Sequence, residues 1–248
     1  FIAPYKGTKE LFEYSFTVKK GKENITKISN TETDYGSFCA ITSDKKTSFV
    51  IGKMSISLPT ELFVIDLKTK TETQITFTNQ AILSQTQMGK VEKRMTKTTD
   101  GKDLLSWVIY PPNFDATKKY PTLLYCQGGP QSALTQFFSY RWNFQLMAAN
   151  GYIIIAPNRR GMPGHGSEWN DAITGDYGGQ CMKDYLSAID DISNEPYVNK
   201  DKLGAVGASF GGYSVYWLAG NHNKRFKTFI AHCGMFNMES WYGTTEQM

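Results

Sequence analysis

Residues 203–219 read LGAVGASFGGYSVYWLA and place a single reactive serine, Ser209, between glycines at positions 207 and 211. A short apolar run precedes this turn, and a helix-like stretch follows it. Strand, tight turn and helix around one serine predict a nucleophile elbow, whose glycines permit a bend that any Cβ would block. Such a bend exposes the Ser209 hydroxyl for acyl transfer and turns the Phe210 N–H toward a developing oxyanion.

A glycine-rich turn that opens a helix can also bind phosphate. The stretch lacks the G-x-G-x-x-G spacing, and no Gly-Lys-Ser/Thr follows it. No acidic residue stands about 20 positions further on, where a ribose partner would be expected. We therefore favour the elbow over a dinucleotide site or a purely structural turn.

Length and composition narrow the class of protein. The 248 residues suffice for one large or two ordinary domains, and we expect two. The net charge is only +4, and no basic run carries interleaved aromatics, which argues against nucleic acid as a partner. No stretch reaches the ~18 apolar residues that a membrane span needs, so we expect a soluble protein without a membrane partner.

The four cysteines are scattered and form no C-x-x-C pair. They predict neither a zinc site nor a disulfide framework, and no cluster of His, Asp and Glu suggests another metal. We expect no cofactor, and we expect the cysteines to behave as small buried hydrophobes. They are Cys39, Cys126, Cys181 and Cys233.

Short alternating or β-branched runs dominate the N-terminal third, residues 1–90, and predict strands. Two of them, 61–67 and 73–77, flank a short polar turn and resemble the outer hairpin of a propeller blade. Some 70 residues make at most two blades, whereas closed propellers need at least about four. We therefore expect the C-terminal portion of an incomplete β-propeller. The remaining expected strands are 11–18, 37–42 and 47–51.

A different pattern begins near residue 91. The Asp100-Gly101 turn predicts a hairpin, and continuous apolar runs then alternate with helical stretches. This alternation predicts a doubly wound, mainly parallel α/β sheet over residues 91–248. The expected strands are 91–98, 103–110, 122–126, 152–156, 203–206 and 226–231, and the expected helices lie near 142–150, 179–193 and 213–219.

The helix near 179–193 has apolar residues at steps of three and four, which predicts one buried face. The residues expected in the core are Met182, Tyr185, Leu186, Ile189 and Ile192, and those expected to face elsewhere are Lys183, Asp184, Asp190 and Asp191.

Two loops should gather near Ser209 at the carboxyl edge of this sheet. Gly128 and Gly129 follow the expected strand 122–126, where a backbone N–H could serve as the second oxyanion donor and contribute on the order of 2.7 to 4 kcal/mol to transition-state binding. The alternative is a plain turn.

Arg159 and Arg160 follow strand 152–156. We favour Arg160 as a residue that binds a substrate carbonyl or carboxylate, with a structural ion pair as the alternative.

Only 248 − 209 = 39 residues follow the serine. In this fold the acid and the histidine of a triad come after further strands, so these residues are too few. We interpret His165, His222 and His232 as ordinary structural or surface histidines.

With these motifs together, the sequence resembles the prolyl oligopeptidase family of serine peptidases. The matching runs are YCQGGP at 125–130, APNRRG at 156–161, GDYGG at 175–179 and GASFGGY at 207–213. The resemblance implies an α/β-hydrolase domain over 91–248, truncated before the triad Asp and His, and a propeller that admits only short or unfolded peptides. It implies Ser209 as nucleophile, with the N–H groups of Phe210 and Gly129 as oxyanion donors; the isolated chain would be nearly inert.

The family often has Tyr or His where Gln127 stands. Because this chain departs from that pattern, we assign the second oxyanion donor to the backbone of Gly129 and not to the side chain of residue 127. The resemblance also suggests an aromatic S1 pocket made by Phe236, Trp241 and Tyr242, with core packing as the alternative.

The implied activity is that of a serine exopeptidase that releases N-terminal dipeptides from a peptide substrate. The alternatives are an acylaminoacyl peptidase, a carboxylesterase and a non-catalytic propeller interaction protein. A homodimer of the full-length protein is left open, and the resemblance suggests a periplasmic or secreted location without excluding the cytoplasm.

Overall fold

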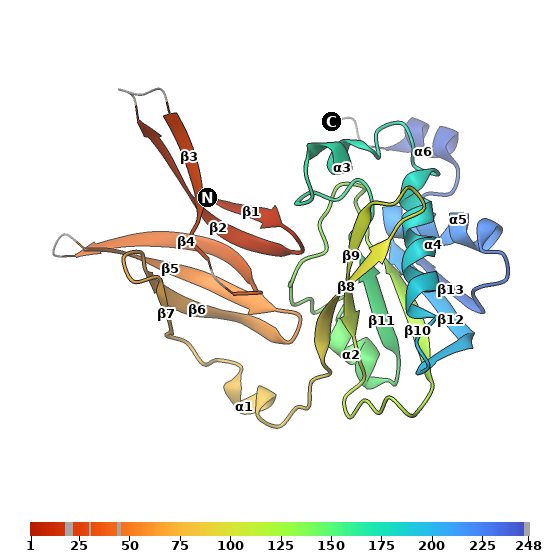
Figure 1. The fold of residues 1–248 in the computed structure, drawn as a ribbon, viewed down its shortest axis with the longest axis horizontal. Helices are drawn as coiled ribbons and strands as arrows, with labels where there is room; N and C mark the ends of the chain where they lie inside the picture. The colour runs from red at the N-terminus through yellow and green to blue at the C-terminus, as the bar shows by residue number, and fades with distance from the viewer. Residues whose placement is uncertain (18–21, 30, 44–45, 246–248) are drawn as a thin grey trace. The chain divides into compact units, whose positions relative to one another are not determined.

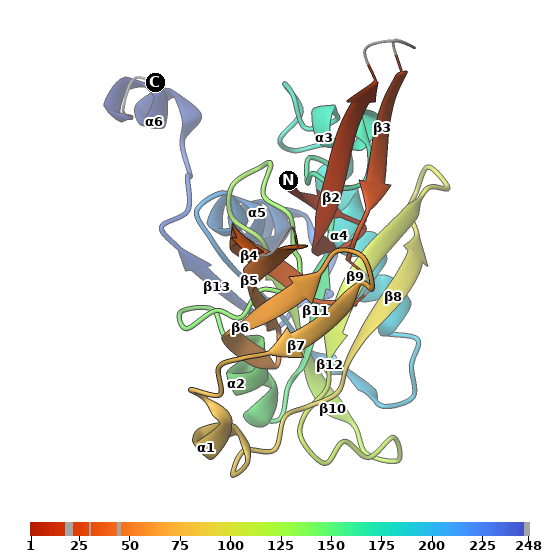
Figure 2. The same cartoon turned by 90° about the vertical axis from the view of Figure 1, so that its left-hand side faces the viewer.

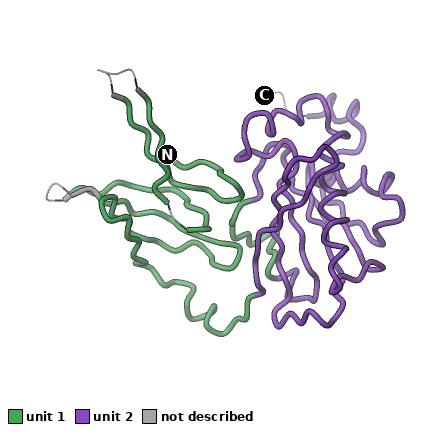
Figure 3. The backbone as a smooth tube through the Cα atoms, viewed as in Figure 1, with its two compact units in different colours: residues 1–88, 135–145 green, residues 89–134, 146–248 purple. Residues whose placement is uncertain are grey.

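The structure, a computed structural model, describes residues 1–17, 22–29, 31–43 and 46–245. The chain forms two compact units (Figure 3). Unit 1 comprises residues 1–88 and 135–145, and unit 2 comprises residues 89–134 and 146–248. Each unit encloses its own cluster of buried hydrophobic residues.

Unit 1 consists of two antiparallel sheets (Figure 1). One has the order β1-β2-β3 and the other is the meander β4-β5-β6-β7, the form of a propeller blade. The expected hairpin is confirmed: Asp66 pairs with Thr71 at its end, and the Asp66 carboxylate accepts hydrogen bonds from two amides of the turn. The strands are β1 (Ile2–Tyr5), β2 (Thr8–Thr17), β3 (Lys22–Lys27), β4 (Asp34–Ser43), β5 (Lys46–Ser55), β6 (Leu58–Asp66) and β7 (Thr71–Gln74).

Unit 1 buries the side chains of Leu11, Tyr35, Ile51 and Ile65. Strands β1 and β3 and the short helix α1 (Gln80–Leu83) were not expected from the sequence. Val18, the expected end of the strand that became β2, lies outside the described residues.

The segment 135–145 belongs to unit 1 because polar groups of that unit bind it. The buried carboxylate of Asp34 accepts hydrogen bonds from the Thr135 hydroxyl and from the Gln136 amide. The Gln136 side chain in turn accepts a hydrogen bond of 3.0 Å from the amide of Ile56. Burial raises the pKa of Asp34, while the hydrogen bonds that the carboxylate accepts oppose this shift.

Unit 2 contains a six-stranded mixed sheet of order β13-β12-β10-β11-β9-β8. The four strands β10 to β13 run parallel to their neighbours among themselves, and β9 joins β11 and β8 antiparallel. The strands are β8 (Val91–Lys97), β9 (Asp103–Ile109), β10 (Tyr120–Cys126), β11 (Ile153–Pro157), β12 (Val198–Ala208) and β13 (Thr228–His232). The mainly parallel sheet is confirmed, and β11 is buried along its whole length, as expected of a strand covered on both faces.

The helices of unit 2 include two long ones that contact each other and the sheet, α4 (Gln180–Ile192) and α5 (Phe210–Asn221). The others are α2 (Phe144–Ala149), which begins at the end of the unit 1 segment, α3 (Ser167–Asp171) and α6 (Met238–Thr244). Figure 2 shows α6 beyond β13 and away from the sheet of its own unit, and none of its residues is buried.

Helix α4 buries the predicted face with two exceptions. Leu186 is only partly buried, and Asp184 is fully buried although we expected it to face elsewhere. An ion pair with Arg160 explains the buried carboxylate. The prediction of buried cysteines holds for Cys126 and Cys181 and is wrong for Cys39 and Cys233, which are exposed on β4 and after β13.

Candidate active site

Ser209 lies between the end of β12 and the start of α5, and its side chain is exposed. Its φ of 59° and ψ of −124° form a conformation that side-chain-bearing residues rarely adopt. The Ser209 amide donates to the His232 carbonyl at 2.9 Å, and the Ser209 carbonyl accepts from the Tyr213 amide at 3.0 Å. These two bonds hold the strained residue in place at the carboxyl end of β12.

The glycines around Ser209 are required by close backbone contacts. A Cβ at Gly207 would lie 2.6 Å from the carbonyl oxygen of Cys126, and one at Gly211 would lie 2.0 Å from the same atom. A Cβ at Gly212 would lie 2.6 Å from the Cα of Gly234. The tight packing of α5 against the ends of β10 and β13 therefore depends on these residues.

The Gly128-Gly129-Pro130 loop leaves β10 next to this turn. A Cβ at Gly128 would lie 2.7 Å from the carbonyl oxygen of Ala208 and 3.4 Å from the Cβ of Ser209. Gly129 has a φ of +59°. Within the described part of the chain, the amides of Gly129 and Phe210 donate no hydrogen bond. Both amides are therefore available to an acceptor at the turn.

Tyr177, in the GDYGG run, contacts the elbow from the loop before α4. Its ring meets the ring of Phe210 edge-on, with centroids 5.2 Å apart. Gly175 in this run has a φ of +71°, a conformation that favours glycine. Sequence reasoning used this run only for the resemblance and missed its contact with Phe210.

Arg160 is buried and bound by two carboxylates. Its guanidinium pairs with Asp184 of α4 and, at 2.6 Å, with Asp100 in the β8–β9 turn, and it lies 4.2 Å from the ring centroid of Trp169. Side-chain hydrogen bonds from Thr98 and Arg160 lower the pKa of Asp100 to about 2. The structure thus shows the structural ion pair that was the alternative from the sequence, and a contact of Arg160 with substrate stays a prediction.

Arg159, which the sequence interpretation passed over, is also fully buried and contacts the elbow. Its guanidinium is 4.7 Å from the ring centroid of Phe210, and it donates to the carbonyl of Pro130 at 2.6 Å. The neighbouring side chain of Gln127 donates to the Ser132 hydroxyl at a long 3.4 Å.

The three proposed S1 aromatics lie before and within α6. Phe236 is 81% exposed, Trp241 44% and Tyr242 83%, so they do not form a core. The Phe236 ring meets that of Tyr216, on α5, edge-on at 5.6 Å.

The histidines have local contacts. His222 accepts a hydrogen bond from the Phe226 amide and packs against Phe229. The carbonyl of His232 receives the Ser209 amide, and the ring of His165 lies 5.9 Å from that of Trp169.

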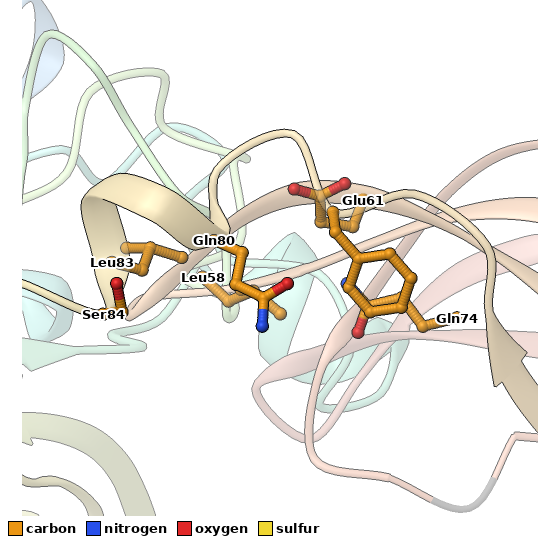
Figure 4. A pocket seen from close by; sticks show the side chains of 7 residues that line it. Leu58, Glu61, Gln74, Gln80, Leu83 and Ser84 are labelled. Carbon is orange, nitrogen blue, oxygen red and sulfur yellow. The ribbon is translucent and has the colours of Figure 1, made fainter.

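A separate cavity of about 390 Å³ lies in unit 1, between β6, β7 and α1 (Figure 4). The carboxylate of Glu61 at its wall accepts hydrogen bonds from Thr76, Thr78 and Asn79, which lower its pKa. The negative charge of Glu61 is therefore stabilised by hydrogen bonds within unit 1.

No group of three or more His, Cys, Asp or Glu side chains in the part of the chain that the structure describes could hold a metal ion. Of the helices whose residues are described, none is long and apolar enough to cross a membrane.

A strained serine between strand and helix, on a mainly parallel sheet, defines an α/β-hydrolase. Residues 138–248 match the Prolyl oligopeptidase family. The chain is 50% identical over all its 248 residues to a dipeptidyl-peptidase 5 of Porphyromonas gingivalis, of which it covers 35%. It is 32% identical over 218 residues, or 87% of its length, to a dipeptidyl-peptidase 5 of Schizosaccharomyces pombe, of which it covers 31%.

Solved structures support the fold. An acylaminoacyl peptidase in complex with Z-Gly-Gly-Phe-chloromethyl ketone superposes with a TM-score of 0.83 at 24% identity, over 98% of this chain and 36% of that one. Dipeptidyl peptidase 4 of Porphyromonas gingivalis gives a TM-score of 0.70 at 24% identity, over 90% of this chain and 31% of that one. These similarities relate the chain to the prolyl oligopeptidase family and give it an α/β-hydrolase unit preceded by strands of a β-propeller; the chain spans about a third of the length of the relatives it matches.

Proposed function

We propose that the protein containing this chain is a serine exopeptidase that releases dipeptides from the amino end of short peptides. The observation that carries this proposal is the φ of 59° at Ser209, exposed beside a Gly-Gly loop. The 50% identity to a dipeptidyl-peptidase 5 over the whole chain supports the choice of dipeptides. Unit 1 is, in this proposal, the C-terminal portion of the propeller.

The chemistry assigned to Ser209 is acyl transfer. Its Oγ adds to the scissile carbonyl carbon while its proton passes to a general base, which we assign to the longer protein. The amides of Phe210 and Gly129 donate to the oxyanion. The C–N bond then breaks, the proton moves to the leaving amine, and water hydrolyses the ester to release the acyl product and restore the serine.

The test is an assay of the full-length protein on dipeptidyl, acyl-aminoacyl and simple ester chromogenic substrates. We expect dipeptidyl substrates to be cleaved with the highest kcat/KM, and Ser209→Ala to lower kcat by about 10⁴-fold or more. Preference for acyl-aminoacyl substrates would indicate an acylaminoacyl peptidase, and cleavage of esters alone a carboxylesterase. No turnover of any of the three classes would contradict the proposal and favour an interaction protein.

We further propose that the exposed aromatics Phe236, Trp241 and Tyr242 contact the acyl part of the substrate. Their exposure supports this proposal, since apolar side chains free of a core can pack against a ligand. Replacing Phe236 by Ala should then raise KM for dipeptidyl substrates with large apolar P1 residues more than for those with P1 alanine. An equal change for both substrates would contradict this assignment.

A further inference from the structure

Arg159 follows β11 directly and is completely buried. Its Nη1 donates to two backbone carbonyls, that of Pro130 at 2.6 Å and that of Arg160 at 2.7 Å. The first bond fixes the residue that follows Gly129. The rigid, planar guanidinium carries donors on separate nitrogens, so Nε can bond another partner while Nη1 holds both carbonyls, whereas lysine has only one nitrogen.

The same guanidinium packs against the elbow. It lies 4.7 Å from the ring centroid of Phe210, and its Nε donates to the Tyr185 hydroxyl at 3.2 Å. One side chain therefore contacts both the loop of Gly129 and the ring of Phe210, the two residues whose amides are the proposed oxyanion donors.

The charge of Arg159 is not neutralised by a nearby carboxylate. None of the ion pairs formed by the described residues includes it, in contrast to Arg160, which has two. In the same part of the chain its buried Nη2 has no hydrogen-bond partner. Burial raises the pKa of the Cys181 thiol to about 11, and the Arg159 cation opposes that shift. An unpaired buried cation is costly, so its presence beside the elbow calls for a functional explanation.

We infer that Arg159 is a positioning residue for the oxyanion site. Its fork holds Pro130, its plane packs on Phe210, and together these contacts keep the amides of Gly129 and Phe210 at a fixed separation. Its unneutralised charge favours negative charge developing nearby. This inference rests on the proposed function, because it presupposes acyl transfer at Ser209.

The test compares variants of the full-length protein on a dipeptidyl substrate, with the concentration of active sites titrated. Arg159→Met keeps much of the side-chain volume without charge or donors, and should lower kcat about 100-fold with KM changed less than about threefold, as loss of one oxyanion donor does. Arg159→Lys keeps the charge without the fork and should lower kcat about tenfold. The control Arg225→Met removes an arginine paired with Asp190 on the surface and should leave kcat unchanged.

A second readout separates positioning from a merely structural role. A peptide aldehyde, which forms a tetrahedral adduct with the serine, should lose affinity in Arg159→Met in proportion to kcat/KM, while the product dipeptide binds as before. A lower Tm with unchanged kcat per active site would overturn the inference. If Arg159→Met does not fold, Arg159→Lys decides: wild-type kcat overturns the inference, and a tenfold loss at constant KM supports it.

Ser209→Ala separates a failure of the proposed function from a failure of the role assigned to Arg159. Turnover retained in Ser209→Ala would overturn the proposed function itself. Loss of turnover in Ser209→Ala, with wild-type kcat in both Arg159 variants, would overturn only the role of Arg159.

Discussion

The backbone of Gly211 packs directly on the carbonyl group of Cys126, and a Cβ at position 211 would lie 2.0 Å from the carbonyl oxygen. This contact sets how closely α5 approaches the end of β10, and so where Ser209 stands relative to the Gly-Gly loop.

Gly211→Ala should destabilise the protein by about 3 kcal/mol, because the methyl group overlaps a backbone atom that cannot move aside. The matched control is Gly220→Ala in the same helix, where a Cβ would have no neighbour within 4 Å. That control should stabilise by about 0.5–1 kcal/mol through helix propensity. Thermal unfolding of both variants measures the difference, and equal Tm values would contradict the packing argument.

Asp184→Ala should destabilise by about 3 kcal/mol, because it leaves the buried cation of Arg160 with only the partly exposed Asp100. The control is Asp190→Ala, also on α4, which breaks an exposed pair with Arg225 and should cost less than about 1 kcal/mol. Chemical denaturation of the two variants gives the comparison. A similar small decrease in the free energy of unfolding of both variants would show that the buried ion pair stabilises the protein no more than the exposed one.

The lowered pKa of Asp100 predicts that the protein loses stability in acid. Its pKa is about 2 in the folded protein and 3.8 ordinarily, so the folded state binds its proton less readily than the unfolded state. The stabilisation is complete above pH 3.8 and is lost as the pH falls toward about 2. Asp100→Asn should lower Tm at pH 7 and flatten the change in Tm over that acid range. An unchanged acid slope in Asp100→Asn would contradict the assigned role.

The elbow could be predicted because its determinants are local. Ser209 and the flanking glycines are adjacent in sequence, and the buried strand β11 is a continuous apolar run. Contacts between distant residues could not be read in this way. Nothing local indicates that Asp184 is buried, since its partner Arg160 lies 24 positions away, or that Asp34 binds Thr135, 101 positions further on.

The choice between the two arginines shows the same limit. Arg159 and Arg160 are adjacent after one strand and bind different partners, the Pro130 carbonyl and Asp184 of α4. Which arginine meets which partner depends on where α4 and the Pro130 loop lie, and the local sequence does not show this. Short elements such as β1 and α6 were missed because four to seven residues carry too little periodicity to predict.

The most direct test of the account is to label the full-length protein with a fluorophosphonate and locate the adduct by tandem mass spectrometry. We predict one equivalent of label on Ser209, with loss of peptidase activity in proportion to labelling. An active enzyme that remains unlabelled, or that carries the label on another residue, would contradict the assignment of Ser209 as the nucleophile.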